Sequence, residues 1–249
     1  MKSFLKKLFS SEPKLGNADL SVLHTDMHSH LIPHIDDGSK STRESLSLIR
    51  ELQKLGYKKF ITTPHIMSDY YKNTPEIILG GLEKLRTAIK QAEIDVELNA
   101  AAEYYLDYDF EKKIPQRNLL TLGKNYLLFE LPFMAPPENL HKVIFELQTN
   151  DYKPVLAHPE RYGFWYRDFN KYIDLKDKGV IFQLNLNSLT THYSVETKKI
   201  AERMIDENMF ELIGTDCHNH EHIALFHQCL ANKHLHKILL KEDLINKEL

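Results

Sequence analysis

Residues 24–38, HTDMHSHLIPHIDDG, combine four histidines with three aspartates, and side chains of these types could bind a metal ion. His28 and His30 lie two positions apart, and Asp36 and Asp37 follow in a turn flanked by proline and glycine. Imidazole nitrogen and carboxylate oxygen are ordinary ligands of divalent transition metals. The stretch alone is also consistent with a polar loop rich in histidine. The choice between these interpretations depends on what the rest of the chain supplies.

Side chains that can bind metal recur at the ends of stretches that are predicted to be strands. Seven short apolar stretches, often bounded by glycine, proline or aspartate, have this character: 22–28, 58–65, 96–104, 125–133, 153–160, 179–187 and 209–218. The sixth, which ends in LNLNS, offers only amides and a hydroxyl. Each of the other six stretches ends in or near a residue whose side chain can bind a metal ion. These residues are His28, His30, His65, Glu103, Glu130, His158, Asp216 and His218.

Taken singly, most of these residues have an ordinary explanation. His65 could be a solvated histidine after a strand, and Glu103 a surface acid. Glu130 is harder to explain in this way, because it interrupts the apolar run YLLFELPF and an unpaired buried carboxylate is costly. The carboxyl ends of parallel strands face one side of an α/β fold, so these side chains are expected to converge there. Their joint occurrence favours a metal site.

Stretches of helical period separate the strands and must hold them in place. Ser41 and Glu44 have the spacing of a capping box before an apolar stripe that ends at Gly56. Further helices are predicted over 74–92, 136–150, 168–178, 195–208 and 222–240. Repeated strand–helix units imply parallel strands with right-handed crossovers. The sequence predicts an α/β fold, an irregular (β/α)7 TIM-like barrel, with an open doubly wound sheet as the alternative.

Composition narrows the class of protein. The 249 residues suffice for one large domain, here expected over 22–249, after a basic N-terminal tail over 1–21 that is expected to be flexible. That tail could make at most weak peripheral membrane contact, and no apolar run has the length of a membrane span. The net charge of −3 argues against nucleic acid as a partner. Two cysteines favour a reducing compartment, so we expect a cytoplasmic protein, with oligomeric state left open.

The chemistry of the ligand set indicates the cofactor. It is nitrogen and oxygen without thiolate, which suits Mn²⁺, Fe²⁺ or Zn²⁺ more than Ca²⁺ or Cu⁺. Of these three we expect Mn²⁺ first. Eight ligands exceed the three or four protein groups that one catalytic ion takes, so two or three divalent metal ions are expected. Cys217 lies between two ligand types, and strand alternation should point it away from them.

At these residues the sequence resembles the polymerase and histidinol phosphatase (PHP) superfamily of metal-dependent phosphoesterases. The motifs DMHSH, TTPH, AAEYY, LAHPERY and GTDCHN carry the resemblance, which covers roughly residues 24 to 225. HLIPHIDDGSKS, ITTPHIMSDYY and LAHPERY are most similar to the bacterial capsular and exopolysaccharide tyrosine-protein phosphatase branch (CpsB/CapC-like). The resemblance implies the PHP fold and a metal-dependent protein-tyrosine phosphatase that acts on a phosphotyrosine protein, a tyrosine autokinase of polysaccharide export.

The resemblance also implies a grouping of the ligands. One ion would be held by His28, His30, Glu103 and Asp216. A second would share Glu103 and take Glu130 and His158. A third would use His65 and His218 with Asp36 or Asp37, between which the sequence does not choose.

Arg161, three residues after His158, matches the arginine that family members direct at the substrate phosphate. His65 or His218 could donate a proton to the leaving group if its ion is absent. His34 departs from the family pattern and is interpreted as a surface substitution rather than an extra ligand. No Lys or Arg follows DCHN before Lys233, so a second phosphate clamp is not visible there.

Two other functions compete with tyrosine phosphatase activity. One keeps the metals and takes a small phosphate monoester such as histidinol phosphate as substrate. The other is a non-catalytic metal protein that only binds phosphotyrosine. Phosphatase chemistry with a cysteine nucleophile is rejected, because neither cysteine has an arginine at the spacing of an H-C-x5-R motif.

Overall fold

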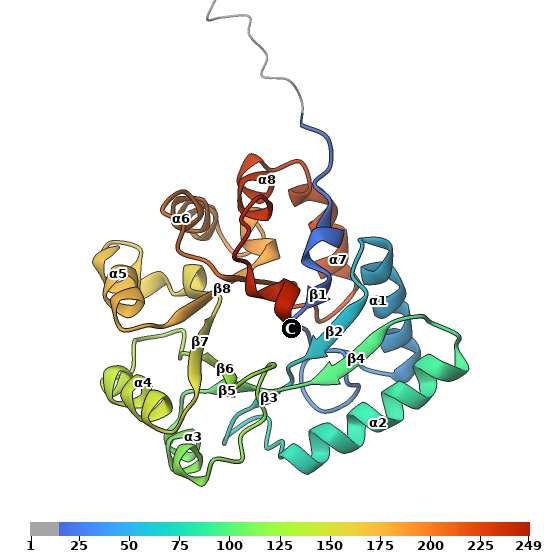
Figure 1. Cartoon of the computed structure of the whole chain (residues 1–249), viewed down its shortest axis with the longest axis horizontal. Coiled ribbons are helices and arrows are strands. Elements are labelled where there is room, and N and C mark those ends of the chain that lie inside the picture. The colour runs from blue at the N-terminus through green and yellow to red at the C-terminus, as the bar shows by residue number, and fades with distance from the viewer. Residues whose placement is uncertain (1–14) are drawn as a thin grey trace, which may run out of the picture.

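Short parallel strands form the centre of the fold and helices lie on their outer side (Figure 1). The computed structural model describes residues 15–249. Within them the strands are β1 (Thr25–Asp26), β2 (Lys59–Thr62), β3 (His65–Ile66), β4 (Glu97–Ala100), β5 (Glu103–Tyr105), β6 (Tyr126–Glu130), β7 (Lys153–Ala157), β8 (Ile181–Asn185) and β9 (Leu212–Gly214). They form a sheet of order β1-β2-β4 and a sheet of order β3-β5-β6-β7-β8-β9.

The two sheets are parts of one curled layer. The predicted strands 58–65 and 96–104 are each interrupted, so that β2 and β3, and likewise β4 and β5, follow one another along the same path. Across the interruption the backbone pairing continues, since Ala101 N–H donates to Thr62 O at 2.9 Å and Glu103 N–H donates to Pro64 O at 3.1 Å. At the other edge, a parallel bridge between Ser29 and Cys217 joins the chain after β1 to the chain after β9. The parallel, barrel-like α/β arrangement predicted from the sequence is therefore confirmed.

The Ser29–Cys217 bridge lies beyond the carboxyl ends of β1 and β9. Towards the amino end of these two strands, the C-terminal residues of the chain fill the gap between them. Asn246 is fully buried in a 3₁₀ helix, η7 (Ile245–Glu248). Its amide nitrogen donates to Thr25 O at 3.0 Å and to Ile213 O at 2.7 Å, and its amide oxygen accepts from Ile213 N–H at 2.9 Å. One side chain thus replaces the backbone pairing that two neighbouring strands would make.

Replacing Asn246 by leucine is expected to lower the free energy of unfolding by about 2–4 kcal/mol, because buried backbone groups of both strands lose their partners. Urea denaturation followed by circular dichroism measures the change. The exposed neighbour Lys247 provides the control, since Lys247→Ala should leave stability within about 0.5 kcal/mol. Equal stability of both variants would show that Asn246 does not join the two strands.

The helices lie mostly where helical period predicts them. They are α1 (Thr42–Lys54), α2 (Pro75–Gln91), α3 (Tyr108–Lys113), α4 (Leu140–Thr149), α5 (Asn170–Asp177), α6 (Val195–Asp206), α7 (His220–Cys229) and α8 (Lys233–Leu239). The predicted N-cap of α1 is confirmed, since Ser41 Oγ accepts from Glu44 N–H at 3.1 Å. Glu44 Oε2 accepts from the N–H of Lys40 at 2.7 Å, one residue before the partner that a capping box would have. The stripe of Leu48 and Leu52 is fully buried.

Three local predictions are wrong. The helix expected over 222–240 is two helices, because the Asn232 side chain accepts from His234 N–H at 2.7 Å and starts α8 afresh. The helix expected from residue 136 begins at Leu140, after the prolines. The first residues of the strand expected over 22–28 belong to a 3₁₀ helix, η2 (Leu20–Leu23).

Packing begins before residue 22, the start predicted for the domain. Ala18 and Leu20 are buried in the core, and Ala18 N–H donates to Leu230 O at 2.7 Å. Residues 1–14 of the predicted tail, with their expected membrane contact, lie outside the described residues. Among residues 15–249, no helix combines the length and the apolar character that crossing a membrane requires.

Candidate metal centre

The predicted ligands meet at one end of the curled sheet, although they come from six different strand ends. His28 and His30 follow β1, His65 begins β3, and Glu103 begins β5. The remaining ligands come from the end of β6 and from the residues that follow β7 and β9: Glu130, His158, Asp216 and His218. Seven of these eight side chains are buried, and His218 is nearly so. The structure therefore brings together every strand-end ligand type that the sequence singles out.

The first group consists of four side chains whose ligand atoms lie at nearly equal separations. His28 Nε2 is 3.3 Å from Glu103 Oε2 and 3.4 Å from Asp216 Oδ1. His30 Nε2 is 3.5 Å from the same glutamate oxygen and 3.4 Å from the same aspartate oxygen. Ligands at 2.0–2.1 Å from a tetrahedral ion would be separated by about 3.4 Å. The separations between these histidine nitrogens and carboxylate oxygens match that spacing, and His28, His30 and Asp216 form one cluster that could hold an ion.

The second group uses the other oxygen of Glu103. His158 Nε2 lies 3.2 Å from Glu103 Oε1 and 3.5 Å from Glu130 Oε1. His158 reaches this position from a left-handed backbone conformation with φ 35° directly after β7. The Glu103 carboxylate thus lies between the two groups, with one oxygen facing each.

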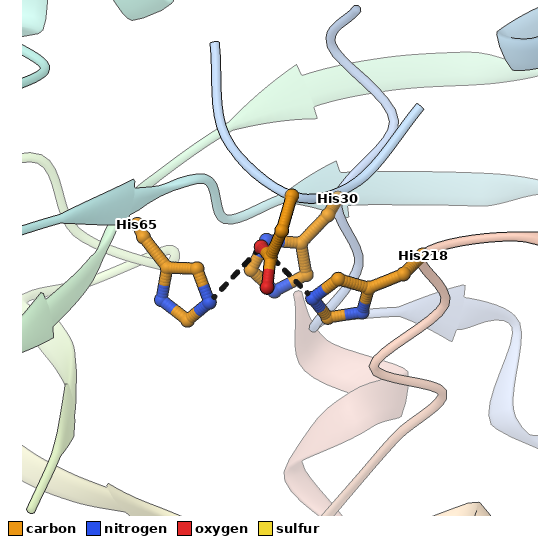
Figure 2. Close-up of side chains that lie close together, drawn as sticks. His30, His65 and His218 are labelled. Atoms are coloured by element: carbon orange, nitrogen blue, oxygen red, sulfur yellow. Dashed lines mark ion pairs between the residues drawn. The ribbon is translucent and has the colours of Figure 1, made fainter. Parts of the chain in front are cut away.

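The third group surrounds Asp37. His65 Nε2 lies 3.5 Å and His218 Nε2 3.3 Å from Asp37 Oδ1. Figure 2 shows both histidines directed at this carboxylate, with His30 behind them, stacked on His218 with ring centroids 4.0 Å apart. His65 also connects this group to the first, because its Nδ1 is 3.1 Å from Glu103 Oε2.

The two aspartates that the sequence could not separate occupy different places. The Asp36 side chain is fully buried, and its Oδ2 is 2.8 Å from His30 Nδ1 and accepts from His65 N–H at 3.2 Å. Half of the Asp37 side chain is exposed, and its Oδ1 faces the histidines of the third group. Asp36 therefore supports His30 from behind, whereas Asp37 stands where a ligand would.

The donor set fits divalent metal ions. Glu103 Oε2 is buried within 3.1–3.5 Å of three imidazole nitrogens but makes no hydrogen bond, and His65 Nδ1 is likewise buried without a hydrogen-bond partner. Buried polar atoms are normally hydrogen-bonded. Atoms that crowd together without hydrogen bonds face a common point rather than one another, which is the arrangement that a cation between them would satisfy.

The electrostatics of the centre favour cations as well. Burial alone would lower the pKa of His28, but the carboxylates of Glu103 and Asp216 raise that pKa to about 9. Burial, with the charge of Glu103 beside it, raises the pKa of Glu130 to about 8. Burial and then the Arg161 guanidinium lower the pKa of His158 to about 4, so its imidazole is neutral at pH 7. The protons that His28 and Glu130 retain near neutral pH offset part of the negative charge of the carboxylates, and bound metal ions would offset the same charge.

Two amide side chains of β8, one in the middle of the strand and one at its end, support the ligands, and sequence reasoning missed both. Asn185 Nδ2 donates to Asp216 Oδ2 at 2.6 Å and to the Tyr193 hydroxyl at 3.0 Å. Gln183 Oε1 lies 2.8 Å from His28 Nδ1. The only signal in the sequence was that this strand, alone of the seven, ended in amides where the others ended in ligand types.

A cavity of about 590 Å³ opens onto the metal groups. Arg161 forms part of its wall, with Nη1 3.0 Å from Asp216 Oδ2. The guanidinium carbon lies 4.2 Å from the ring centroid of Tyr193 and 5.0 Å from that of Phe133. The guanidinium thus lies over both rings while it contacts the aspartate and lines the cavity.

Two further residues noted in the sequence lie away from the ligand atoms. His34 is exposed on the outer side of its loop, with φ 68°, and faces another surface hollow, which agrees with the interpretation as a surface substitution. Cys217 is fully buried in the hydrophobic core, as strand alternation predicts.

Comparison with known proteins places this geometry in a family. The family model for capsular polysaccharide synthesis, CpsB/CapC, matches residues 24–245. The tyrosine-protein phosphatase YwqE of Bacillus subtilis (strain 168) is 28% identical over 195 residues, which cover 78% of this chain and 77% of that protein. The putative tyrosine-protein phosphatase CapC of Staphylococcus aureus is 27% identical over 195 residues, which cover 78% of this chain and 76% of that protein.

Solved structures share the fold. A chain from the crystal structures of YwqE from Bacillus subtilis and CpsB from Streptococcus pneumoniae, described as unique metal-dependent tyrosine phosphatases, matches with a TM-score of 0.78 at 24% identity, covering 90% of this chain and 94% of that one. A histidinol phosphate phosphatase from Lactococcus lactis, solved with zinc, L-histidinol and phosphate, matches with a TM-score of 0.52 at 13% identity. The match covers 85% of this chain and 93% of that one. The family match spans almost the whole described chain and includes all the ligand-bearing strand ends, so this protein belongs to the CpsB/CapC family of capsular polysaccharide synthesis proteins.

Proposed function

We propose that this protein is a metal-dependent protein-tyrosine phosphatase that hydrolyses phosphotyrosine. The observation that carries the proposal is the convergence of histidines and carboxylates, in four overlapping clusters that could each hold a metal ion, at a cavity that Arg161 also lines. The names of the relatives support phosphotyrosine as the substrate class, and the family description supports a role in capsular polysaccharide synthesis.

The proposed ligand assignment follows the three groups. His28, His30, Glu103 and Asp216 would hold one ion; Glu103, Glu130 and His158 a second; and Asp37, His65 and His218 a third. We propose two or three divalent ions, manganese first and iron or zinc as alternatives; ligands of nitrogen and oxygen without thiolate are compatible with all three. When bound, such ions make water a stronger nucleophile near neutral pH and offset the negative charge of the phosphoryl oxygens.

The residues of this chain have separate tasks in that reaction. Arg161 presents a planar fork of N–H donors, which matches two phosphate oxygens. Its contacts with Asp216 and with the rings of Tyr193 and Phe133 restrict the orientation of that fork. A tyrosine leaving group has a pKa near 10, so the demand on a proton donor is modest, and His65 or His218 on the cavity wall could supply the proton when the third ion is absent.

The physiological partner is proposed as a tyrosine-phosphorylated protein, a tyrosine autokinase of polysaccharide export, reached in the cytoplasm. The shape of the cavity mouth is compatible with an aromatic substrate side chain. Tyr71, Tyr105 and Phe133 line it, and Met134 beside them is almost fully exposed. These apolar surfaces would contact a phenyl ring while the phosphate reaches the charged base.

The decisive experiment compares two substrates on the same metal-loaded protein. A phosphotyrosine peptide should be hydrolysed with a higher kcat/KM than histidinol phosphate, and exhaustive chelation should remove the activity until Mn²⁺ is restored. Faster turnover of histidinol phosphate would make the protein a small-molecule phosphatase. Tight binding of the peptide without hydrolysis of either ester, in protein shown to contain metal, would favour the binding role.

Asp37 and Asp36 provide a test of the ligand assignment. Asp37→Asn is expected to lower the metal content by the ion of the third group while the other ions stay bound. Asp36→Asn should instead weaken the ion held by His30, because the imidazole loses its charged partner, typically 10–100-fold in affinity. Elemental analysis of both variants after dialysis against Mn²⁺ measures the difference. The same loss in both would contradict the separate roles.

A further inference from the structure

Gln183, in the middle of β8, contacts residues of two metal groups although it is no ligand itself. Its side-chain oxygen lies 2.8 Å from His28 Nδ1 and accepts from the His158 backbone N–H at 3.3 Å. His28 belongs to the first group and His158 to the second. Gln183 and His28 are both fully buried.

The orientation of the Gln183 amide is fixed by its other contact. Its nitrogen donates to the carbonyl oxygen of Leu184 at 2.6 Å. A flipped amide would place N–H donors against the His158 N–H and an oxygen against the Leu184 carbonyl, and both contacts would be repulsive. The amide oxygen therefore faces the two histidines. Since it can only accept, His28 must carry its proton on Nδ1, which leaves Nε2 free for the first group.

We propose that Gln183 is a positioning residue that couples the first and second metal groups. One amide oxygen sets the tautomer and ring direction of His28 and also holds the backbone of His158 in the left-handed conformation that directs its imidazole at Glu103. The Glu103 carboxylate connects the two groups in front, and Gln183 connects them behind. Loss of the Gln183 oxygen should loosen ligands of both groups together.

Gly214 on the neighbouring strand β9 leaves the space that this arrangement needs. A Cβ atom at this position would lie 2.5 Å from the Cβ of His28 and 2.9 Å from the amide nitrogen of Gln183. Both distances are shorter than any normal carbon contact. The strand therefore requires glycine here because the His28–Gln183 pair occupies the place of a side chain.

The inference rests on the proposed metal binding but not on the proposed substrate, so it is tested by metal affinity. Metal-free full-length protein is titrated with Mn²⁺ in a calorimeter. Gln183→Met, which keeps the volume and removes the acceptor, should lower the affinity for two ions by about 10–100-fold each. Gln183→Glu, which restores an acceptor oxygen, should recover most of that loss. The control is Gln91→Met on the exposed last residue of α2, which should bind as the wild type does.

Asp36→Asn separates this coupling from any coupling through Glu103, because Asp36 supports a histidine of the first group and contacts no ligand of the second. Through His30 and the backbone of His65 it should weaken ions of the first and third groups and leave the second unchanged. Gln183→Met that weakens only one ion, or Asp36→Asn that weakens the second ion as much as the first, would overturn the proposal. Wild-type protein that binds no Mn²⁺ would instead refute the proposed function.

A second measurement needs no variant, so it decides the matter even if Gln183→Met does not fold. In Zn²⁺-loaded wild-type protein, nitrogen NMR of the histidine side chains should show His28 with its proton on Nδ1 and its Nε2 bound to metal. A His28 that carries its proton on Nε2 would overturn the assignment.

Discussion

Glu103→Gln is expected to abolish phosphatase activity, with kcat reduced at least about 10³-fold, which corresponds to about 4 kcal/mol of transition-state stabilisation. The two oxygens of Glu103 face different groups, Oε2 toward His28 and His30 and Oε1 toward His158. An amide of the same shape has only one oxygen and no negative charge, so it cannot serve both groups. Elemental analysis together with a steady-state assay on a phosphotyrosine peptide measures the loss.

The control for this variant is Glu97→Gln. Glu97 lies on β4, which precedes β5 along the same path, and its side chain is exposed and paired with Lys59 at 2.9 Å. It should retain full activity and metal content. Wild-type activity in Glu103→Gln would show that no shared carboxylate is needed, and the proposed metal chemistry would then be wrong.

The convergence of the ligands was predictable because it depends on a rule of chain geometry. Parallel strands place their carboxyl ends on one side, so residues as distant as His28 and Asp216 were expected to meet once the strands were recognised. Glu130 was the strongest single signal, since a carboxylate inside an apolar strand requires a compensating partner. The structure places it 3.5 Å from His158. The roles of these residues as metal ligands stay predictions.

The direction of individual side chains in turns could not be predicted. Asp36 and Asp37 are adjacent, of the same type and equally suited to bind metal. Only the path of the loop decides that one faces backward to His30 and the other toward the cavity. The same loop turns His34 outward through a positive φ, which no local pattern in the sequence signals for a histidine.

Sequence patterns did not predict the residues that support the ligands, and the reason is chemical. Amides such as Gln183 and Asn185 are common in strands and turns, and no spacing rule marks the few that hold a ligand. Their contacts join positions far apart in the chain, as between Gln183 and His28, so the partners become apparent only when the strands are closed into a ring. The break between α7 and α8 was missed in a similar way, because the apolar pattern continues through Asn232, whose side chain caps the second helix.

Arg161→Ala is expected to reduce kcat/KM for a phosphotyrosine peptide by about 10²–10³-fold, the usual cost of removing a donor directed at developing negative charge. Metal content should stay at the wild-type level. Arg161 contacts Asp216 through Oδ2, which also accepts from Asn185, whereas Oδ1 faces the histidines of the first group.

The aspartate therefore keeps a hydrogen-bond partner on Oδ2 and its place in the first group when the arginine is removed. Arg161→Lys keeps the charge but not the planar fork of donors, so it should recover only part of the loss, with a raised KM as its main defect. Inorganic phosphate should inhibit both variants more weakly than the wild type, because phosphate binding is the task assigned to this residue. If metal content fell in Arg161→Ala as far as in Glu103→Gln, Arg161 would belong to the support of the ions, and the phosphate would have to be held by other groups of the cavity wall.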